Sequence, residues 1–375
     1  MKKFILIDHE PWTLRRKQLF YDLFETAGIP LEVWDLSQML NPGLHNPDEL
    51  EEAPYLTKIR TKQEFETLVS LKNNSSTIFI EEVLRIWSNR HVFQQLSNYG
   101  FKTIKIEFYG NTKVTQGILS RLKNIKRNEI IPIIKNKITT LKFKLYQRYH
   151  KIPPYPTYLL SSNSQSPERI CFNHPDYEDI SFKENVRLID NDYIVFSDIF
   201  FPYHPDLKYF YKIHNLPDGR KYHKLMRQYF DFLEEKYGMP VIIAAHPKAE
   251  YKGDEFGNRR IIKYHTANLI KYCKFVTMHY CNTISFAMIT NKPVAYIVTN
   301  DYLSIPGTLN KLNSLVVETL GLQYFNIESA QFKETFKFSR VKPDLREKYI
   351  YSYITSPKTK NIPNYQTLYN TLMSI

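Results

Sequence analysis

Short apolar runs alternate with amphipathic stretches from the start of the chain. The run at 4–7 is continuous and ends in polar residues, as is typical of a buried parallel strand that emerges at its carboxyl end. The stretch 14–27 carries apolar residues at helical spacing and is followed by Gly28, a residue type that often ends helices. A second strand is predicted at 30–36, so the chain opens with a β-α-β unit.

The same alternation continues through both halves of the chain. Strands interleaved with helical patterns favour doubly wound α/β domains. A proline cluster at 152–156 suits a connection between domains. We therefore predict two Rossmann-like domains that face a central cleft, at 1–150 and 151–375, with the last helices able to cross back. The further strands are predicted at 76–80, 102–108, 193–196, 239–245, 275–278 and 293–298.

The segment 112–149 is dense in lysine and arginine and has apolar residues at helical spacing. It is predicted to be a basic amphipathic helix that breaks near Pro132. Two interpretations stay open for it. It is either a surface helix with a solvated lysine face or a segment that attaches to an anionic membrane surface.

Composition narrows the class of protein. The 375 residues are 43% hydrophobic and 24% charged, which excludes a largely disordered chain. The formal charge of +13 favours an anionic partner, and three cysteines without CxxC spacing support neither a disulfide framework nor a zinc cluster. No apolar stretch approaches the roughly 20 residues that a membrane span needs. These features predict a cytoplasmic location.

Ligands of open α/β sheets bind outside the carboxyl ends of the strands, so polar residues that follow the apolar runs are the candidates for chemistry. Asp8, His9 and Glu10 follow the first strand. A carboxylate or imidazole there would deprotonate an acceptor hydroxyl. The structural alternative is that Asp8 or Thr13 caps the next helix, and for Thr13 we prefer that interpretation.

Two strand ends in the second half carry groups suited to phosphate. An imidazole and an ammonium follow the strand 239–245, and the proline between them restricts the backbone. The strand 275–278 leads through hydroxyl residues into a helix, whose free N–H groups would seat an anion. The structural alternatives are a histidine that satisfies its own strand end and ordinary helix caps. The candidate phosphate-binding residues are His246, Pro247, Lys248, Arg260, His279, Thr283 and Ser285.

Several motifs are absent from the sequence: GxGxxG after a strand, GxxxxGK[ST], HExxH and GxSxG. Dinucleotide-binding, P-loop, zincin and α/β-hydrolase functions therefore lack their sequence signatures. The one DxD, Asp190-Asn191-Asp192, precedes a strand and is predicted to be a turn. We expect neither a metal nor a cofactor.

The sequence resembles the two-Rossmann-domain glycosyltransferases called GT-B. The resemblance rests on the two α/β halves, on a strand that ends in His246-Pro247, and on a later strand that leads into Thr283 and Ser285. More narrowly, these motifs resemble the bacterial sialyltransferase-like enzymes, although the specific match is confined to 241–298. The resemblance implies a nucleotide-sugar donor, with a CMP-linked keto-sugar acid favoured. It places His246 at the donor phosphate and the two hydroxyl residues at phosphate or nucleotide; Lys248 is our own addition.

The acidic motif of those enzymes, two acidic residues before a glycine, is half present as Asp218-Gly219. The catalytic base is therefore open. Because the base of inverting GT-B enzymes often comes from the N-terminal domain, Asp8 is the first choice, with His9, Glu10 and Asp218 in reserve. A UDP- or GDP-sugar donor stays open, as does a sugar epimerase or a teichoic-acid-type polymerase on the same architecture.

The combined prediction is a metal-independent glycosyltransferase that builds a bacterial surface glycan such as capsule or lipopolysaccharide. The basic segment would hold it at the inner membrane face, where lipid-linked oligosaccharide acceptors reside. The alternative from another class is a nucleic-acid-binding protein, prompted by the charge and by 28 Tyr and 24 Phe. It predicts basic and aromatic residues interleaved on one face, whereas the lysines concentrate in 112–149, so no nucleic-acid partner is expected.

Overall fold

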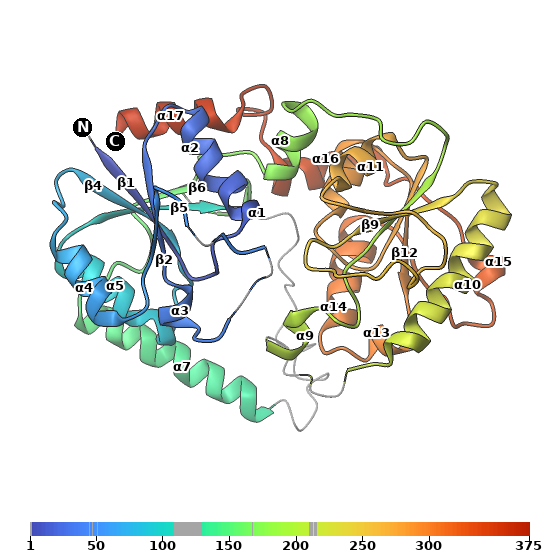
Figure 1. Ribbon diagram of the computed structural model, residues 1–375, viewed down its shortest axis with the longest axis horizontal. Coiled ribbons are helices and arrows are strands. Elements are labelled where there is room, and N and C mark those ends of the chain that lie inside the picture. Colours follow the sequence, from blue (N-terminus) through green and yellow to red (C-terminus); the bar gives the residue numbers. More distant parts are fainter. Residues whose placement is uncertain are drawn as a thin grey trace.

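The computed structural model describes residues 2–44, 46, 48–50, 52–108, 130–166, 168–209, 213 and 216–375. The chain forms two α/β domains that lie side by side, each built on one sheet with helices on both faces (Figure 1). Every described pair of neighbouring strands is parallel. The predicted fold class of two Rossmann-like domains is confirmed.

The first sheet has the order β3-β2-β1-β4-β5-β6-β7 in the described residues. The chain moves outward from β1 to β3 and then returns to place β4 beside β1, so the strand order reverses between β1 and β4. Such a switch point opens a crevice at the carboxyl ends of the strands. The strands are β1 (Lys3–Asp8), β2 (Leu31–Asp35), β3 (Leu56–Lys58), β4 (Thr77–Glu82), β5 (Lys102–Glu107), β6 (Tyr158–Ser161) and β7 (Ile170–Cys171).

The second sheet repeats this arrangement with the order β10-β9-β8-β11-β12-β13. Its switch point lies between β8 and β11. The inner strands are continuous apolar runs with fully buried side chains, as expected for a sheet covered on both faces. The strands are β8 (Ile194–Ser197), β9 (Val241–Ala245), β10 (Ile261–Lys263), β11 (Phe275–Met278), β12 (Val294–Val298) and β13 (Tyr324–Asn326).

The predicted helix at 14–27 is present, but it contains a π-helical turn, η1 (Lys17–Tyr21), between α1 (Leu14–Arg16) and α2 (Asp22–Thr26). Gly28 follows with a φ of +69°, a conformation that glycine adopts readily. The other helices of the first domain are α3 (Ser37–Leu40), α4 (Lys62–Ser70), the 3₁₀ turn η2 (Trp87–Asn89), α5 (Arg90–Asn98) and α7 (Ile130–Tyr149).

The second domain has one long helix, α10 (Gly219–Tyr237), and many short ones. Most lie between the strands or after the last of them. They are α8 (Pro175–Ser181), α9 (Pro205–Tyr209), α11 (Thr266–Tyr272), α12 (Ile284–Ile289), α13 (Asn300–Leu303), α14 (Thr308–Leu312), η4 (Asn313–Thr319), α15 (Phe332–Thr335), α16 (Pro343–Tyr349) and η5 (Ile350–Ile354). The last helix of the chain, α17 (Asn364–Ser374), packs on the first domain.

The domain boundary does not lie at residue 150. The strands β6 and β7 extend the first sheet, and the second sheet begins only with β8. The helix α17 returns to the first domain, where Leu368 and Leu372 join the apolar core that contains Phe4 and Phe24. The chain therefore crosses between the domains twice, and Figure 1 shows α17 lying against α2.

The helix α7 begins at Ile130 and continues past Pro132 to Tyr149. The break near Pro132 stays a prediction, because only two described residues of the helix precede the proline. The remainder of the predicted basic helix, 112–129, lies outside the described residues. Across the part of the chain that the structure describes, no helix is both long and apolar enough to cross a membrane.

Candidate functional site

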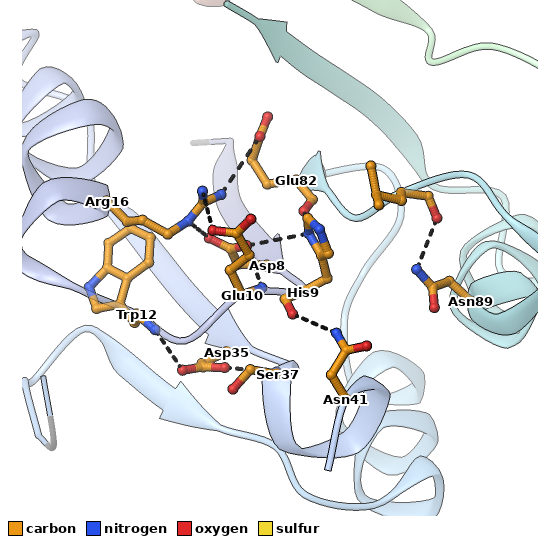
Figure 2. Close-up of polar contacts among 11 residues, drawn as sticks. Asp8, His9, Glu10, Trp12, Arg16, Asp35, Ser37, Asn41, Glu82 and Asn89 are labelled. Atoms are coloured by element: carbon orange, nitrogen blue, oxygen red, sulfur yellow. Dashed lines mark hydrogen bonds and ion pairs between the residues drawn. The ribbon is translucent and has the colours of Figure 1, made fainter. Parts of the chain in front are cut away.

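At the switch point of the first sheet, two acidic residues end neighbouring strands. Asp8 ends β1 and is the register partner of Glu82, which ends β4. Arg16 forms an ion pair with Asp8 and lies 3.7 Å from the Glu82 carboxylate and 3.5 Å from that of Glu10 (Figure 2). Thr13 accepts a hydrogen bond from the Arg16 N–H and so caps α1, as predicted.

Burial dominates the electrostatics of this cluster. It raises the pKa of Asp8 to about 6 and that of Glu82 to about 8, although Arg16 opposes both shifts. Glu82 is affected more because its contact with Arg16 is longer and the nearby Asp8 charge adds to the penalty. Asp8 is fully buried and bound to the guanidinium. It is therefore poorly placed as the free base for which it was the first choice.

His9 is better placed for that role. Its Nδ1 lies 2.5 Å from the backbone oxygen of Glu82, and because a carbonyl only accepts, Nδ1 carries the hydrogen. The neutral ring then keeps its lone pair on Nε2. The Asp8 carboxylate lies 3.7 Å from Nδ1, where it would stabilise a protonated ring, and Asn41 fixes the His9 carbonyl at 3.1 Å (Figure 2). The side chain is 19% exposed, so the base candidate is partly open to solvent.

At the second switch point, Asp198 organises the loop that follows β9. One carboxylate oxygen accepts hydrogen bonds from the Tyr251 hydroxyl at 2.7 Å and from the His246 N–H at 3.3 Å. The other accepts from the N–H of Phe200 at 3.0 Å. Burial raises the pKa of Asp198 to about 6 despite these hydrogen bonds. Asp198 thus holds His246 and Tyr251 in place and has its own oxygens occupied.

His246 is a neutral hydrogen-bond donor. Its Nδ1 accepts from the Lys248 N–H at 3.1 Å, so the ring hydrogen is on Nε2. Burial, followed by the neighbouring His204, Lys248 and Lys263, lowers the pKa of His246 to about 3. The His204 ring stands edge-on at 4.7 Å. Lys263 is the register partner of the last residue of β9, which puts it at the same edge of the sheet.

The third predicted edge is mostly buried. His279 is fully buried, donates from Nδ1 to the Ile297 carbonyl at 2.8 Å and accepts at Nε2 from the Tyr222 hydroxyl at 2.9 Å. Ser285 is also fully buried and bonds to Asp176 and to the Asn282 carbonyl. The polar atoms of both side chains are already engaged in hydrogen bonds within the protein. Neither residue is therefore retained as a candidate phosphate-binding residue.

The short helix α12 does not provide the expected anion seat either. It has six residues, too few for a strong dipole at its start. Thr283 remains at the sheet edge, half-buried, with its hydroxyl 2.7 Å from that of Ser197.

One further candidate caps a helix, and another lies away from His246. Asp218 is exposed and caps α10 by accepting a hydrogen bond from the Arg220 N–H at 2.9 Å. Arg260 precedes β10 and its carbonyl accepts from Ile243, so it lies toward the amino end of the strands, away from His246. Pro247 is exposed between His246 and Lys248. The structure adds Tyr251 and His204 to the sequence-based set and places Lys263, a positive charge already noted in the sequence, at the same edge as His246.

The domains meet beside these clusters. The Tyr264 hydroxyl donates to Asp48 at 2.9 Å, and Arg15 lies 3.7 Å from Asp179. Figure 1 shows α1, which follows β1, and α9, which follows β8, on the sides of the domains that face each other. A pocket of about 650 Å³ opens between the domains, but none of the predicted site residues lines it. Its lining includes Arg15, Asp22, Glu178, Lys183, Tyr264 and Asn364.

Within the described ranges, no group of three or more His, Cys, Asp or Glu side chains is arranged to hold a metal ion. Arg16 already occupies the space among the carboxylates at the first switch point. The arrangement supports proton transfer at the first switch point and hydrogen bonding to an anion at the second.

No family model and no curated protein matches the sequence. Among solved structures, the glycosyltransferase SnogD from Streptomyces nogalater is 9% identical with a TM-score of 0.49, covering 100% of this chain and 99% of that one. UDP-GlcNAc 2-epimerase from Methanocaldococcus jannaschii is 12% identical with a TM-score of 0.48, and MurG from Acinetobacter baumannii is 6% identical with 0.44. Both of these cover 100% of each chain. Similarity at this level assigns neither a family nor an activity, and the fold rests on the sheet orders above.

Proposed function

We propose that the protein is a glycosyltransferase that moves a sugar from a nucleotide-sugar donor to an acceptor hydroxyl. One observation carries the proposal. The two sheets carry complementary groups at the carboxyl ends of their strands: a proton acceptor, His9, beside the switch point of the first sheet, and donors to phosphate, His246, Lys248 and Lys263, at the ends of β9 and β10 in the second. Transfer from a sugar phosphate ester to a hydroxyl needs both.

In this mechanism the acceptor hydroxyl gives its proton to His9 Nε2 while its oxygen attacks the anomeric carbon of the donor. The bond from that carbon to the phosphate oxygen breaks, and the phosphate leaves with the electron pair. The Nε2–H of His246 and the nearby ammonium groups stabilise the departing charge. Asp8 stabilises the protonated His9 ring, which lies 3.7 Å away, and Arg16 keeps Asp8 ionised and in position.

For the donor we favour a CMP-linked keto-sugar acid, because His246-Pro247 and Thr283 occur at the strand ends that the sialyltransferase-like resemblance assigns to the donor. Burial of Ser285 removes one element of that resemblance. UDP- and GDP-sugars are therefore the alternatives that the experiment must separate.

For the acceptor we propose a bacterial surface glycan, such as capsule or lipopolysaccharide, or its lipid-linked precursor. The protein would work in the cytoplasm at the inner membrane face, with no metal and no nucleic acid. The support is the basic helix α7, which has five lysine or arginine residues and no acidic residue.

Calorimetric titration with CMP, CDP, UDP and GDP tests the donor half of the proposal. We expect one nucleotide to bind selectively, and His246→Ala to weaken its binding by about 1.5–3 kcal/mol through loss of a hydrogen bond to a charged group. Lys263→Gln should also weaken binding. Arg260→Gln is the matched control, because Arg260 lies on the same strand region but away from His246.

If the protein binds none of these nucleotides, the proposed function is refuted. Equal weakening by Arg260→Gln and Lys263→Gln would mean that general positive charge, and not the edge at His246, attracts the nucleotide. Product analysis with the selected nucleotide sugar, with and without a glycan acceptor, then separates transfer from epimerisation.

A further inference from the structure

The helix α7 has two faces that are both apolar, and only one of them is covered. Phe143 is buried in the core of the first domain, and Tyr146 packs its ring edge-on against Trp87 at 5.6 Å and bonds to Gln94. These contacts fix the helix to the domain by its inner face. The outer face therefore has a defined direction, away from the protein.

A stripe of large apolar side chains runs along that outer face. Its members follow one another at spacings of four, three, four and four residues, which at 3.6 residues per turn keeps them within roughly 80° of the circumference. They are between 49% and 83% exposed. The stripe consists of Ile134, Ile138, Leu141, Leu145 and Tyr149.

Cations flank the stripe on both sides. Lys135 and Lys142 lie along one margin and Lys137, Lys144 and Arg148 along the other, given the helical repeat. All five side chains are exposed, and the helix has no acidic residue. An apolar strip bordered by positive charge matches the boundary of an anionic bilayer, where apolar side chains enter the acyl region and cations meet the headgroups.

We propose that α7 docks the protein onto an anionic lipid surface through this stripe. A second copy of the chain is a poorer occupant, because pairing two such helices would bring their positive margins together. Tyr149, at the end of the stripe, has the amphipathic ring that suits a membrane interface. Figure 1 shows α7 along the outer edge of the first domain with its first described turn reaching toward the second domain, so docking would set the region between the domains near the bilayer.

The docking does not depend on the proposed activity, and flotation without any substrate tests it. The full chain should float with vesicles of phosphatidylcholine and phosphatidylglycerol, and much less with phosphatidylcholine alone. Changing Ile138, Leu141 and Leu145 to Gln should lower the partition coefficient at least about 100-fold. The matched control is a triple variant that changes exposed apolar residues elsewhere in the chain: Leu71→Gln, Leu84→Gln and Val186→Gln. This control should float like the wild type.

A second pair of variants tests the charge. Each cation near an anionic surface contributes roughly fivefold to binding, so changing Lys135, Lys137 and Lys142 to Gln should weaken it by about 100-fold. The control changes three exposed lysines of the second domain, Lys274, Lys342 and Lys348. Tryptophan fluorescence of each variant verifies that the first domain remains folded.

Flotation of the stripe variant at the wild-type level would overturn the proposal, as would equal binding to neutral vesicles. Light scattering after gel filtration tests the alternative that a second copy of the chain binds the stripe. If the wild type is a dimer and the stripe variant a monomer, the stripe is a subunit interface and the lipid proposal is wrong.

Discussion

Replacing Glu82 by glutamine should stabilise the first domain at high pH. Burial raises the pKa of Glu82 from 4.5 to about 8. Between these values the folded chain holds a proton that the unfolded chain has released, so stability falls as the pH rises through this window. Glutamine has the same shape and no charge to bury, and Arg16 keeps its ion pairs with Asp8 and Glu10.

The expected size follows from the two pKa values. Their difference corresponds to on the order of 5 kcal/mol of unfolding free energy at pH 9, and to less than about 1 kcal/mol at pH 5. The three tryptophans, Trp12, Trp34 and Trp87, all lie in the first domain, so urea unfolding followed by tryptophan fluorescence reports that domain. We expect Glu82→Gln to raise the urea midpoint at pH 9 by roughly 2 M, for an m-value of about 2–3 kcal/mol/M.

The comparison between the two pH values decides the outcome. If Glu82→Gln changes the midpoint equally at pH 5 and pH 9, Glu82 does not hold a proton in the fold. If the variant is less stable at pH 9, the charged carboxylate stabilises the fold through Arg16, and the argument from burial is reversed. Glu10→Gln is the control for the loss of a carboxylate that contacts Arg16, because the Glu10 side chain is 51% exposed whereas Glu82 is mostly buried.

Three other substitutions separate catalytic from structural roles. His9→Gln should lower kcat for sugar transfer by about 10²–10⁴-fold and leave nucleotide affinity unchanged, whereas an equal loss of affinity would mark a structural role. Ser285→Ala removes a hydrogen bond to buried Asp176 and should lower the unfolding free energy by about 1–3 kcal/mol, with unchanged nucleotide affinity by calorimetry. Asp218→Ala removes the cap of α10 and should cost about 1 kcal/mol in a melting experiment, with Asp218→Ser matching the wild type and transfer rates equal in all three proteins.

The central strands could be predicted from the sequence because a strand buried on both faces must be a continuous apolar run. The edge strands carry no such signal. β3 has three residues, Leu56–Lys58, and β7 has two, Ile170–Cys171, and all of these side chains are only partly buried. Because the sequence carries no clear signal for β6 and β7, the proline cluster at 152–156 predicts a domain boundary that comes before these two strands of the first sheet.

The candidate site was predictable only as a set of strand ends. The sequence predicts that Asp8 and His9 lie at one edge of the sheet. It does not reveal that Glu82 lies beside Asp8, because these register partners are 74 residues apart in the chain. That neighbour decides the roles, since its carbonyl fixes the His9 tautomer and its carboxyl shares Arg16 with Asp8. In the second domain, His279 and Ser285 have suitable chemistry, but packing against Tyr222 and Asp176 buries both.

The charges of the two switch points also constrain how a donor would bind under the proposed function. In the first domain Arg16 is already paired with the carboxylates of Asp8 and Glu10, so a phosphate there would be repelled by these two groups. In the second domain the buried carboxylate of Asp198 is occupied by hydrogen bonds, and the ammonium groups of Lys248 and Lys263 add to burial and to His204 in lowering the pKa of His246. Under the proposed function, a nucleotide phosphate would therefore bind at the second switch point. With the phosphate held there, the sugar would extend toward the first domain, and the acceptor hydroxyl would approach from the side of His9.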